Sequence, residues 1–172
     1  MHDDHLGALL ERNARAVGLR PALARKTGTT TVRLKPGLEC EVSEGRWTMA
    51  VGVGPSSGGS DAGPGPGVLG RGALGSCLAI GYAMWAARLG VTFTSLEVVV
   101  EADYDVRGEL GVSDDVPPGY TQVRCIVTVS SPSPEEAVRR VIDTADKYSP
   151  YRDVFVRAHD VRRELRIAAE TT

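Results

Sequence analysis

Cysteine and histidine are both scarce, because the 172-residue chain has only three of each. Cys40, Cys77 and Cys125 are odd in number and far apart, and no Cys-x-x-Cys pair occurs. This spacing excludes a disulfide framework and argues against a zinc site. We therefore expect no metal, no cofactor and a cytoplasmic location.

An excess of charge of either sign is also missing: 20 basic and 22 acidic residues give a formal net charge of −2. The chain thus lacks the basic surface with which proteins bind nucleic acid. No apolar run reaches the length of about 20 residues that a membrane helix needs. We expect neither a nucleic-acid nor a membrane partner. The hydrophobic content of 42% suffices for one domain with a core.

The most unusual stretch lies between Arg71 and Arg88, with no charged residue inside it. Large apolar residues recur at spacings of three and four, which predicts a helix that is apolar on nearly all sides and buried. We expect Pro66 to open this helix. Each interior glycine costs about 1 kcal/mol, and close approach of another backbone is the expected compensation. Cys77 lies in this small-residue patch.

The chain before this stretch predicts a helix, a set of short strands and a loop. Asp4–Ala24 has helical periodicity. The loop Gly54–Gly67 is nearly all Gly, Pro and Ser, so it should not order itself, and it lacks the ending of a phosphate-binding loop. The period of two predicts strands at Thr30–Leu34, Leu38–Ser43 and Trp47–Val53.

Two long strands are predicted after the central helix. Residues 96–106 alternate apolar and acidic side chains, which is typical of a sheet with one solvated face, although an acidic row could also bind a cation. The partner strand Tyr120–Ser130 carries Cys125 on its apolar face. We therefore expect Cys125, like Cys40, to behave as a small buried hydrophobic residue.

The last part of the chain predicts an amphipathic helix with Ser133 as its N-cap. Pro150 should end this helix, with one more turn over Tyr151–Val156. Residues between Val161 and Ile167 fit a closing strand only loosely. Antiparallel strands interrupted by helices indicate an α+β fold. We divide the chain into a helical arm, residues 1–28, and one domain, residues 29–172.

Two motifs flank the start of the central helix. They are Gly-Gly-Ser-Asp-Ala-Gly-Pro-Gly-Pro-Gly-Val-Leu at residues 58–69 and Ala-Leu-Gly-Ser-Cys-Leu-Ala at residues 73–79. Together they resemble the signature of the OsmC/Ohr family of osmotically inducible and organic-hydroperoxide-resistance proteins. The resemblance implies antiparallel sheets around a buried central helix, and two copies interlocked as an intertwined homodimer. It also implies an active site at the subunit interface.

The resemblance further implies a chemistry for the central cysteine. In peroxidase members of the family a cysteine thiolate near an arginine attacks the peroxide and becomes a sulfenic acid. A second cysteine then forms a disulfide with it, and an external dithiol restores the pair. The chemistry is sound because only the thiolate is nucleophilic and a nearby cation stabilises it. Cys77 matches the attacking cysteine of the family motif.

Other positions of the family pattern differ here. The second cysteine precedes a proline in the family, and that place is held by Ser149 before Pro150. The family's glutamate falls on Val68. The strand before the glycine loop lacks the family's arginine, so Arg46 and Arg71 are the candidates for stabilising the thiolate.

Three functions are compatible with these residues. The first is a thiol-dependent hydroperoxide reductase of one-cysteine type, in which Cys77 is oxidised by a small hydroperoxide and restored by an external thiol. Cys125 would act as the second cysteine only if its strand passes near Cys77. A cysteine hydrolase would need His159 as its base. The alternative to an enzyme is a redox sensor or a binder of a small apolar ligand, with a pocket lined by Val68, Leu69, Met84 and Trp85.

Overall fold

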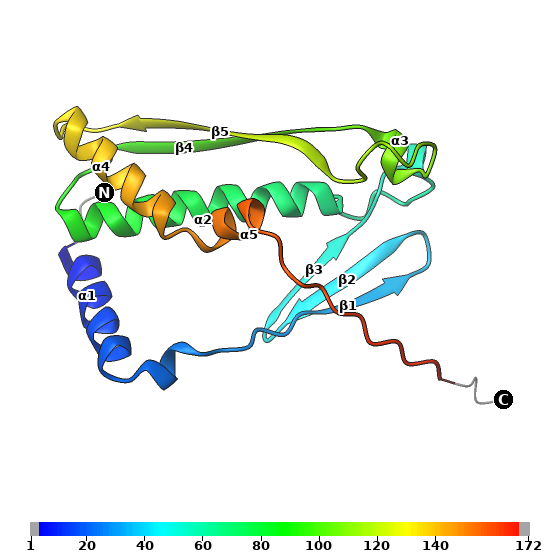
Figure 1. Ribbon diagram of the computed structural model, residues 1–172, viewed down its shortest axis with the longest axis horizontal. Coiled ribbons are helices and arrows are strands. Elements are labelled where there is room, and N and C mark those ends of the chain that lie inside the picture. The colour runs from blue at the N-terminus through cyan, green and yellow to red at the C-terminus, as the bar shows by residue number, and fades with distance from the viewer. Residues whose placement is uncertain (1–3, 169–172) are drawn as a thin grey trace.

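The computed structural model describes residues 4–168, which form a mixed α+β structure with two antiparallel sheets, as the sequence predicts (Figure 1). The elements in chain order are α1 (Asp4–Leu19), η1 (Pro21–Ala24), β1 (Thr31–Lys35), β2 (Glu39–Glu44), β3 (Trp47–Val51), η2 (Pro55–Ser57), α2 (Pro66–Leu89), β4 (Ser95–Tyr104), α3 (Val106–Glu109), β5 (Tyr120–Ser130), α4 (Glu135–Lys147) and α5 (Pro150–Val156).

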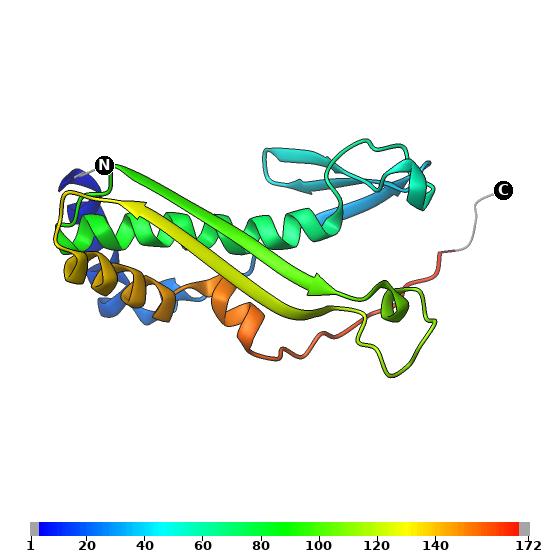
Figure 2. The same ribbon diagram turned by 90° about the horizontal axis from the view of Figure 1, so that it is seen from above.

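The strands β1, β2 and β3 form an antiparallel meander, in which Val42 pairs with Val32 on one side and Met49 on the other. The predicted strands are thus confirmed, except that β3 ends at Val51, two residues before the expected end. The meander lies to one side of the N-terminal part of α2, extends past the end of the helix and is not packed along it (Figures 1 and 2).

The central helix α2 begins at Pro66, as expected. Its buried side is one row of residues four apart, each at most 3% exposed: Leu74, Leu78, Tyr82 and Ala86. Another side of the helix is open, and Ile80 is 61% exposed. The prediction of burial on nearly all sides is therefore wrong for the single chain, because its own elements cover only part of the helix. Within residues 4–168 no helix has both the length and the apolar character to cross a membrane.

The glycines of α2 differ in what they contact. Gly75 lies against β4, where an added Cβ would be 3.2 Å from Cγ2 of Val100. Gly72 and Gly81 would place a Cβ in open space. Close packing within the chain therefore compensates for the cost of only some of these glycines.

The hairpin of β4 and β5 lies across α2, and α4 and α5 run beside the helix (Figure 2). The acidic side of β4 is exposed as predicted, and there Arg124 of β5 pairs with Glu101 at 3.0 Å and with Asp103 at 2.5 Å. On the other face, α4 contributes Val141 and Ala145 to the core. This arrangement fixes α4 and the start of α5 against one side of α2.

The prediction of Ser133 as a helix cap is wrong, because α4 begins after Pro134 without a side-chain cap. The Ser133 hydroxyl instead accepts a hydrogen bond from the N–H of Thr92 at 3.3 Å. The break at Pro150 is confirmed. Here Ser149 caps α5, and its hydroxyl accepts a hydrogen bond from the N–H of Arg152.

Both ends of the described chain depart from the sequence predictions. The expected helix Asp4–Ala24 ends at Leu19, since Pro21 cannot continue it and opens the short helix η1. The loosely predicted closing strand does not form in the described chain: residues 158–168 have no regular secondary structure, and Val161 is 90% exposed.

The glycine-rich loop before α2 is ordered, contrary to expectation. Its backbone donates hydrogen bonds from Asp61 to the carbonyl of Val53 and from Ser60 to the carbonyl of Gly37. A Cβ added at Gly63 would lie 2.4 Å from the carbonyl oxygen of Ala50. Glycine allows the loop to pack directly on β3, and this backbone contact replaces the side-chain burial that the loop lacks.

Candidate functional site

Cys77 and Ser149 meet where α2 passes the start of α5. The Sγ atom of Cys77 lies 3.6 Å from the Oγ atom of Ser149, within hydrogen-bond distance for sulfur. Ser149 is 6% exposed and Cys77 is half-buried. The serine oxygen also accepts the N–H of Arg152, and between Ser149 and Cys77 either the hydroxyl or the thiol can be the donor. The residue in place of the family's second cysteine is thus next to Cys77 in space.

An open cavity of about 640 Å³ lies in front of this pair. Its wall combines one side of α2 with the α4–α5 junction, and aromatic and aliphatic side chains predominate. The lining residues are Ala73, Ser76, Cys77, Ile80, Gly81, Met84, Trp85, Ala145, Tyr148, Ser149, Pro150 and Tyr151. None of them carries a charge, so the described chain alone offers Cys77 an apolar surrounding.

The cavity wall includes an aromatic pair. The rings of Trp85 and Tyr148 are stacked, with centroids 5.3 Å apart and planes 20° apart. Trp85 and Met84 were predicted for this pocket, but Tyr148 and Tyr151 were not. The sequence held one signal for these two tyrosines. The family pattern places Ser149 opposite Cys77, and Tyr148 and Tyr151 flank the Ser149-Pro150 pair.

The other residues predicted for the site lie elsewhere. Val68 and Arg71 line two shallower cavities near the start of α2, and the Arg71 guanidinium donates to the Tyr120 hydroxyl at 3.2 Å. Arg46 is in the turn between β2 and β3, 4.9 Å from the centre of the Trp47 ring. Leu69, also predicted for the pocket, is not among the residues that line the Cys77 cavity.

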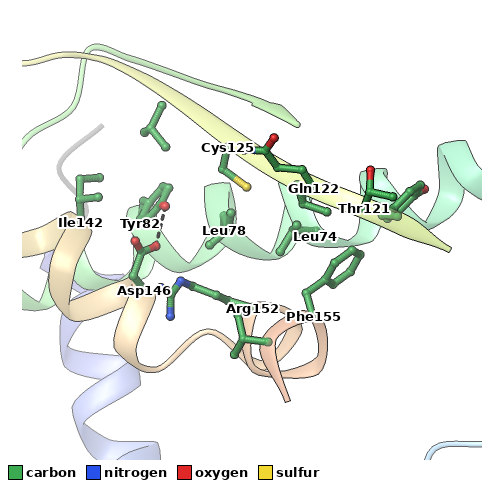
Figure 3. Close-up of a pocket in the computed structure, with 14 residues that line it drawn as sticks. Leu74, Leu78, Tyr82, Thr121, Gln122, Cys125, Ile142, Asp146, Arg152 and Phe155 are labelled. Carbon is green, nitrogen blue, oxygen red and sulfur yellow. Dashed lines mark hydrogen bonds between the residues drawn. The ribbon is translucent and has the colours of Figure 1, made fainter. Parts of the chain in front are cut away.

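Cys125 lines a different cavity, of about 690 Å³, between β5 and the helices α2, α4 and α5 (Figure 3). The prediction that Cys125 is buried is wrong, because the residue is exposed at the edge of this cavity; Cys40 is half-buried. Partial burial of the Cys125 thiol, together with the Asp146 carboxylate, raises the pKa of Cys125 above its usual value. A raised pKa lowers the fraction of Cys125 that is present as the reactive thiolate at neutral pH. The two cavities share no lining residue.

Tyr82 also lines the Cys125 cavity, where its side chain lies beside Asp146 (Figure 3). Its hydroxyl donates a hydrogen bond to Oδ1 of Asp146 at 2.7 Å and so ties α2 to α4. Burial, and secondly this bond to a carboxylate, raise the pKa of Tyr82 well above its usual value. Tyr82 is therefore a neutral hydrogen-bond donor at physiological pH.

The described chain does not bring together the residues that a metal centre or a cysteine hydrolase would need. Among residues 4–168 no group of three or more His, Cys, Asp and Glu side chains is placed to hold a metal ion. His159 is exposed in the segment after α5 and does not line the Cys77 cavity.

Comparisons with known proteins agree with this fold and motif. The family model described as OsmC-like protein matches residues 58–163. No curated protein matches the chain at a significant level.

Among solved structures, an OsmC-like protein from Mycoplasma pneumoniae is 17% identical, with a TM-score of 0.65 over 76% of this chain and 87% of that one. An organic hydroperoxide resistance protein from Elizabethkingia anophelis is 15% identical, with a TM-score of 0.57 over 77% and 91%. An organic hydroperoxide resistance protein from Legionella pneumophila is 14% identical, with a TM-score of 0.55 over 77% and 92%. The family model matches more than half of this chain, which therefore belongs to the OsmC-like protein family.

Proposed function

We propose that this protein is a thiol-dependent hydroperoxide reductase of one-cysteine type, with Cys77 as its nucleophile. The observation that carries the proposal is the position of Cys77: its sulfur is half-buried, lines an open apolar cavity and lies 3.6 Å from the Ser149 hydroxyl. An apolar wall suits the organic part of an alkyl or aryl hydroperoxide.

The reaction has an oxidation step and a reduction step. The Cys77 thiolate attacks one peroxide oxygen, so that an S–O bond forms and the O–O bond breaks. The second oxygen leaves as an alkoxide and takes a proton to become the alcohol, while the sulfur becomes a sulfenic acid. An external thiol then attacks this sulfur, water leaves and a mixed disulfide forms. A second external thiol attacks the mixed disulfide, which releases Cys77 and the oxidised reductant.

An external thiol is needed because no second cysteine lines the Cys77 cavity. Ser149 cannot form a disulfide, and Cys125 lines the separate cavity beyond the row of Leu74, Leu78 and Tyr82. The sulfenic acid therefore persists until a small thiol or the thiol of a reducing protein reaches the open cavity.

We also propose that the protein functions as an intertwined homodimer. Apolar side chains are exposed on the meander and on α2 of the single chain, among them Leu34 at 70%, Trp47 at 64% and Ile80 at 61%. Burial of such area in a second copy contributes about 25 cal/mol per Å². Since Ile80 also lines the Cys77 cavity, a second copy on this side of α2 would complete the site. Any cation beside Cys77 must then come from that copy, and Arg46 at the exposed hairpin turn is the candidate.

Steady-state turnover tests the proposal. With cumene hydroperoxide and dithiothreitol, the protein should consume peroxide catalytically. Cys77→Ser should abolish this turnover, and the double variant Cys40→Ser/Cys125→Ser should keep it. Turnover that depends on Cys125 and not on Cys77 would disprove the assignment.

A second function is favoured by the absence of charged residues among those that line the Cys77 cavity. On that basis the protein would be a redox sensor or a non-catalytic carrier of a small apolar ligand. Native mass spectrometry of the freshly purified protein tests the carrier: a stoichiometric apolar ligand, displaced in Ile80→Glu, together with no peroxide turnover would support it. An empty protein with rapid turnover would contradict it.

A further inference from the structure

The N-terminal helix α1 is packed on the C-terminal end of α2 through a glycine. Gly7 is buried, and a Cβ added there would lie 2.7 Å from the carbonyl oxygen of Ala87. That distance is too short for any real side chain, so the two backbones are in direct contact at this point. No other residue type fits at Gly7 without moving α1.

One turn further along α1, an ion pair links the same two helices. Oε1 of Glu11 accepts a hydrogen bond from Nε of Arg88 at 2.8 Å and forms an ion pair with Nη2 at 2.6 Å. The Arg88 side chain is only 25% exposed and lies over the Trp85 ring, 4.3 Å from its centre. A guanidinium over the face of an indole ring is attracted to that face, which limits the movement of the ring.

Trp85 in turn forms the wall of the Cys77 cavity. It stacks on Tyr148, and both rings line the cavity that Cys77 opens into. A continuous set of contacts thus runs from Glu11 through Arg88 and Trp85 to Tyr148, the residue before Ser149.

From these contacts we propose that α1 is a positioning element for the Cys77 cavity. By holding Arg88 on Trp85, α1 fixes the Trp85–Tyr148 stack as a rigid wall for the apolar group of a ligand. For the reductase proposed above, on which this part rests, the wall would set a preference for aryl hydroperoxides over small ones. A wall fixed before binding lowers the entropy cost of ordering it around a ligand.

Two glycine substitutions on the same helix test this proposal. Alanine favours helix over glycine at both Gly7 and Gly18, by about 1 kcal/mol. Gly7→Ala must displace α1, whereas a Cβ at Gly18 meets nothing within 4 Å. Gly18→Ala is therefore the matched control.

Alkylation of Cys77 tests, without requiring catalysis, how the wall affects the access of a reagent to the sulfur. In the Cys40→Ser/Cys125→Ser background, the rate constant is measured with a small reagent, iodoacetamide, and with an aryl reagent, N-phenylmaleimide. We expect Gly7→Ala to lower the aryl-to-small ratio about threefold, and Gly18→Ala to leave it unchanged. An unchanged ratio in Gly7→Ala, or the same change in both variants, would overturn the proposal.

Steady-state kinetics then separate a positioning role from a general loss of structure. For Gly7→Ala the KM for cumene hydroperoxide should rise about threefold with kcat unchanged, and hydrogen peroxide turnover should stay the same. An equal loss with both peroxides would contradict a role in positioning. If the unaltered protein reduces no peroxide, the reductase proposal fails, and the alkylation ratio still decides the role of α1.

A second pair of variants applies if Gly7→Ala does not fold. Glu11→Gln should lower the same alkylation ratio, and Glu11→Asp, which keeps the carboxylate, should restore most of it. Glu135→Gln is the control, because it breaks the exposed pair of Glu135 with Arg139 on α4, and neither of these two residues lines the Cys77 cavity. Equal ratios for Glu11→Gln and Glu135→Gln would overturn the proposal.

Discussion

The Sγ atom of Cys77 and the Oγ atom of Ser149 lie 3.6 Å apart, although 72 positions separate them in the sequence. Ser149 reaches this place because α4 ends at Lys147 and α5 starts at Pro150, so that the short junction between the two helices directs Ser149 onto α2. A side chain at this position is thus placed to react or bond with the product of Cys77 oxidation. In this chain that side chain is a hydroxyl, which bonds to sulfur without forming a disulfide.

The first prediction is that Ser149→Cys gains an internal disulfide. Since the two side chains are already within 3.6 Å, one equivalent of hydroperoxide should convert Cys77 and the new cysteine into a disulfide. Peptide mapping of the oxidised protein should identify the crosslinked pair. Ser76→Cys, in the same cavity but adjacent to Cys77 in sequence, serves as control and should give no such peptide. A persistent sulfenic acid in Ser149→Cys would contradict the proximity of the two side chains.

The second prediction concerns the hydroxyl of Ser149 itself. Ser149→Ala removes the cap of α5 and the hydrogen-bond partner of the Cys77 sulfur, so the free energy of unfolding should fall by about 1 kcal/mol. Alkylation of Cys77 by iodoacetamide at neutral pH should slow about threefold. Ser149→Thr keeps a hydroxyl and should retain most of both properties. Equal alkylation rates in the Ala and Thr variants would argue that the hydroxyl does not act on the thiol.

The third prediction is a stability effect of Tyr82 at high pH. At neutral pH, the substitution Tyr82→Phe should lower the free energy of unfolding by about 2 kcal/mol, because the half-buried Asp146 carboxylate loses its hydrogen-bond donor. The pKa of Tyr82 is raised in the folded protein, so its contribution is complete below pH 10, the ordinary tyrosine value, and declines as pH rises above it.

Urea unfolding at pH 8 and at pH 11 measures this effect. The difference in unfolding free energy between the parent protein and Tyr82→Phe should become smaller at pH 11. A difference that grows between these two pH values would contradict the assigned direction of the pKa shift.

The fourth prediction tests the order of the glycine-rich loop. Gly63→Ala should destabilise the protein by about 1–3 kcal/mol, because its Cβ would lie 2.4 Å from the Ala50 carbonyl oxygen. Gly54→Ala meets nothing within 4 Å and has extended backbone angles that alanine adopts easily. It should be neutral or stabilise by about 0.5 kcal/mol. Thermal denaturation distinguishes the two, and equal melting temperatures would mean that the loop is loose after all.

Local patterns predicted the elements of the fold well, because hydrophobic periodicity and the effect of proline depend only on a few neighbouring residues. The meander, the start of α2 at Pro66 and the break at Pro150 are examples. The order of the loop at Gly63 could not be predicted, since it depends on a backbone contact with Ala50 and not on side-chain burial.

The site was predictable only where a family motif or a neighbouring proline marked a residue. Cys77 and Ser149 were found in this way, and the structure places them together. The family pattern also suggested Arg46 and Val68 for the site, but neither lines the Cys77 cavity of the described chain. The contact of Glu11 with Arg88 joins positions 77 residues apart, and no local pattern indicates it.

Trapping of a sulfenic acid is the most direct test of the central claim that Cys77 is an accessible redox nucleophile. The reduced protein would be treated with one equivalent of cumene hydroperoxide in the presence of dimedone and then mapped by mass spectrometry. We predict that the adduct forms on Cys77, that one equivalent of alcohol is released, and that Cys40 and Cys125 remain unlabelled. An unlabelled Cys77 with the peroxide unconsumed would contradict the account.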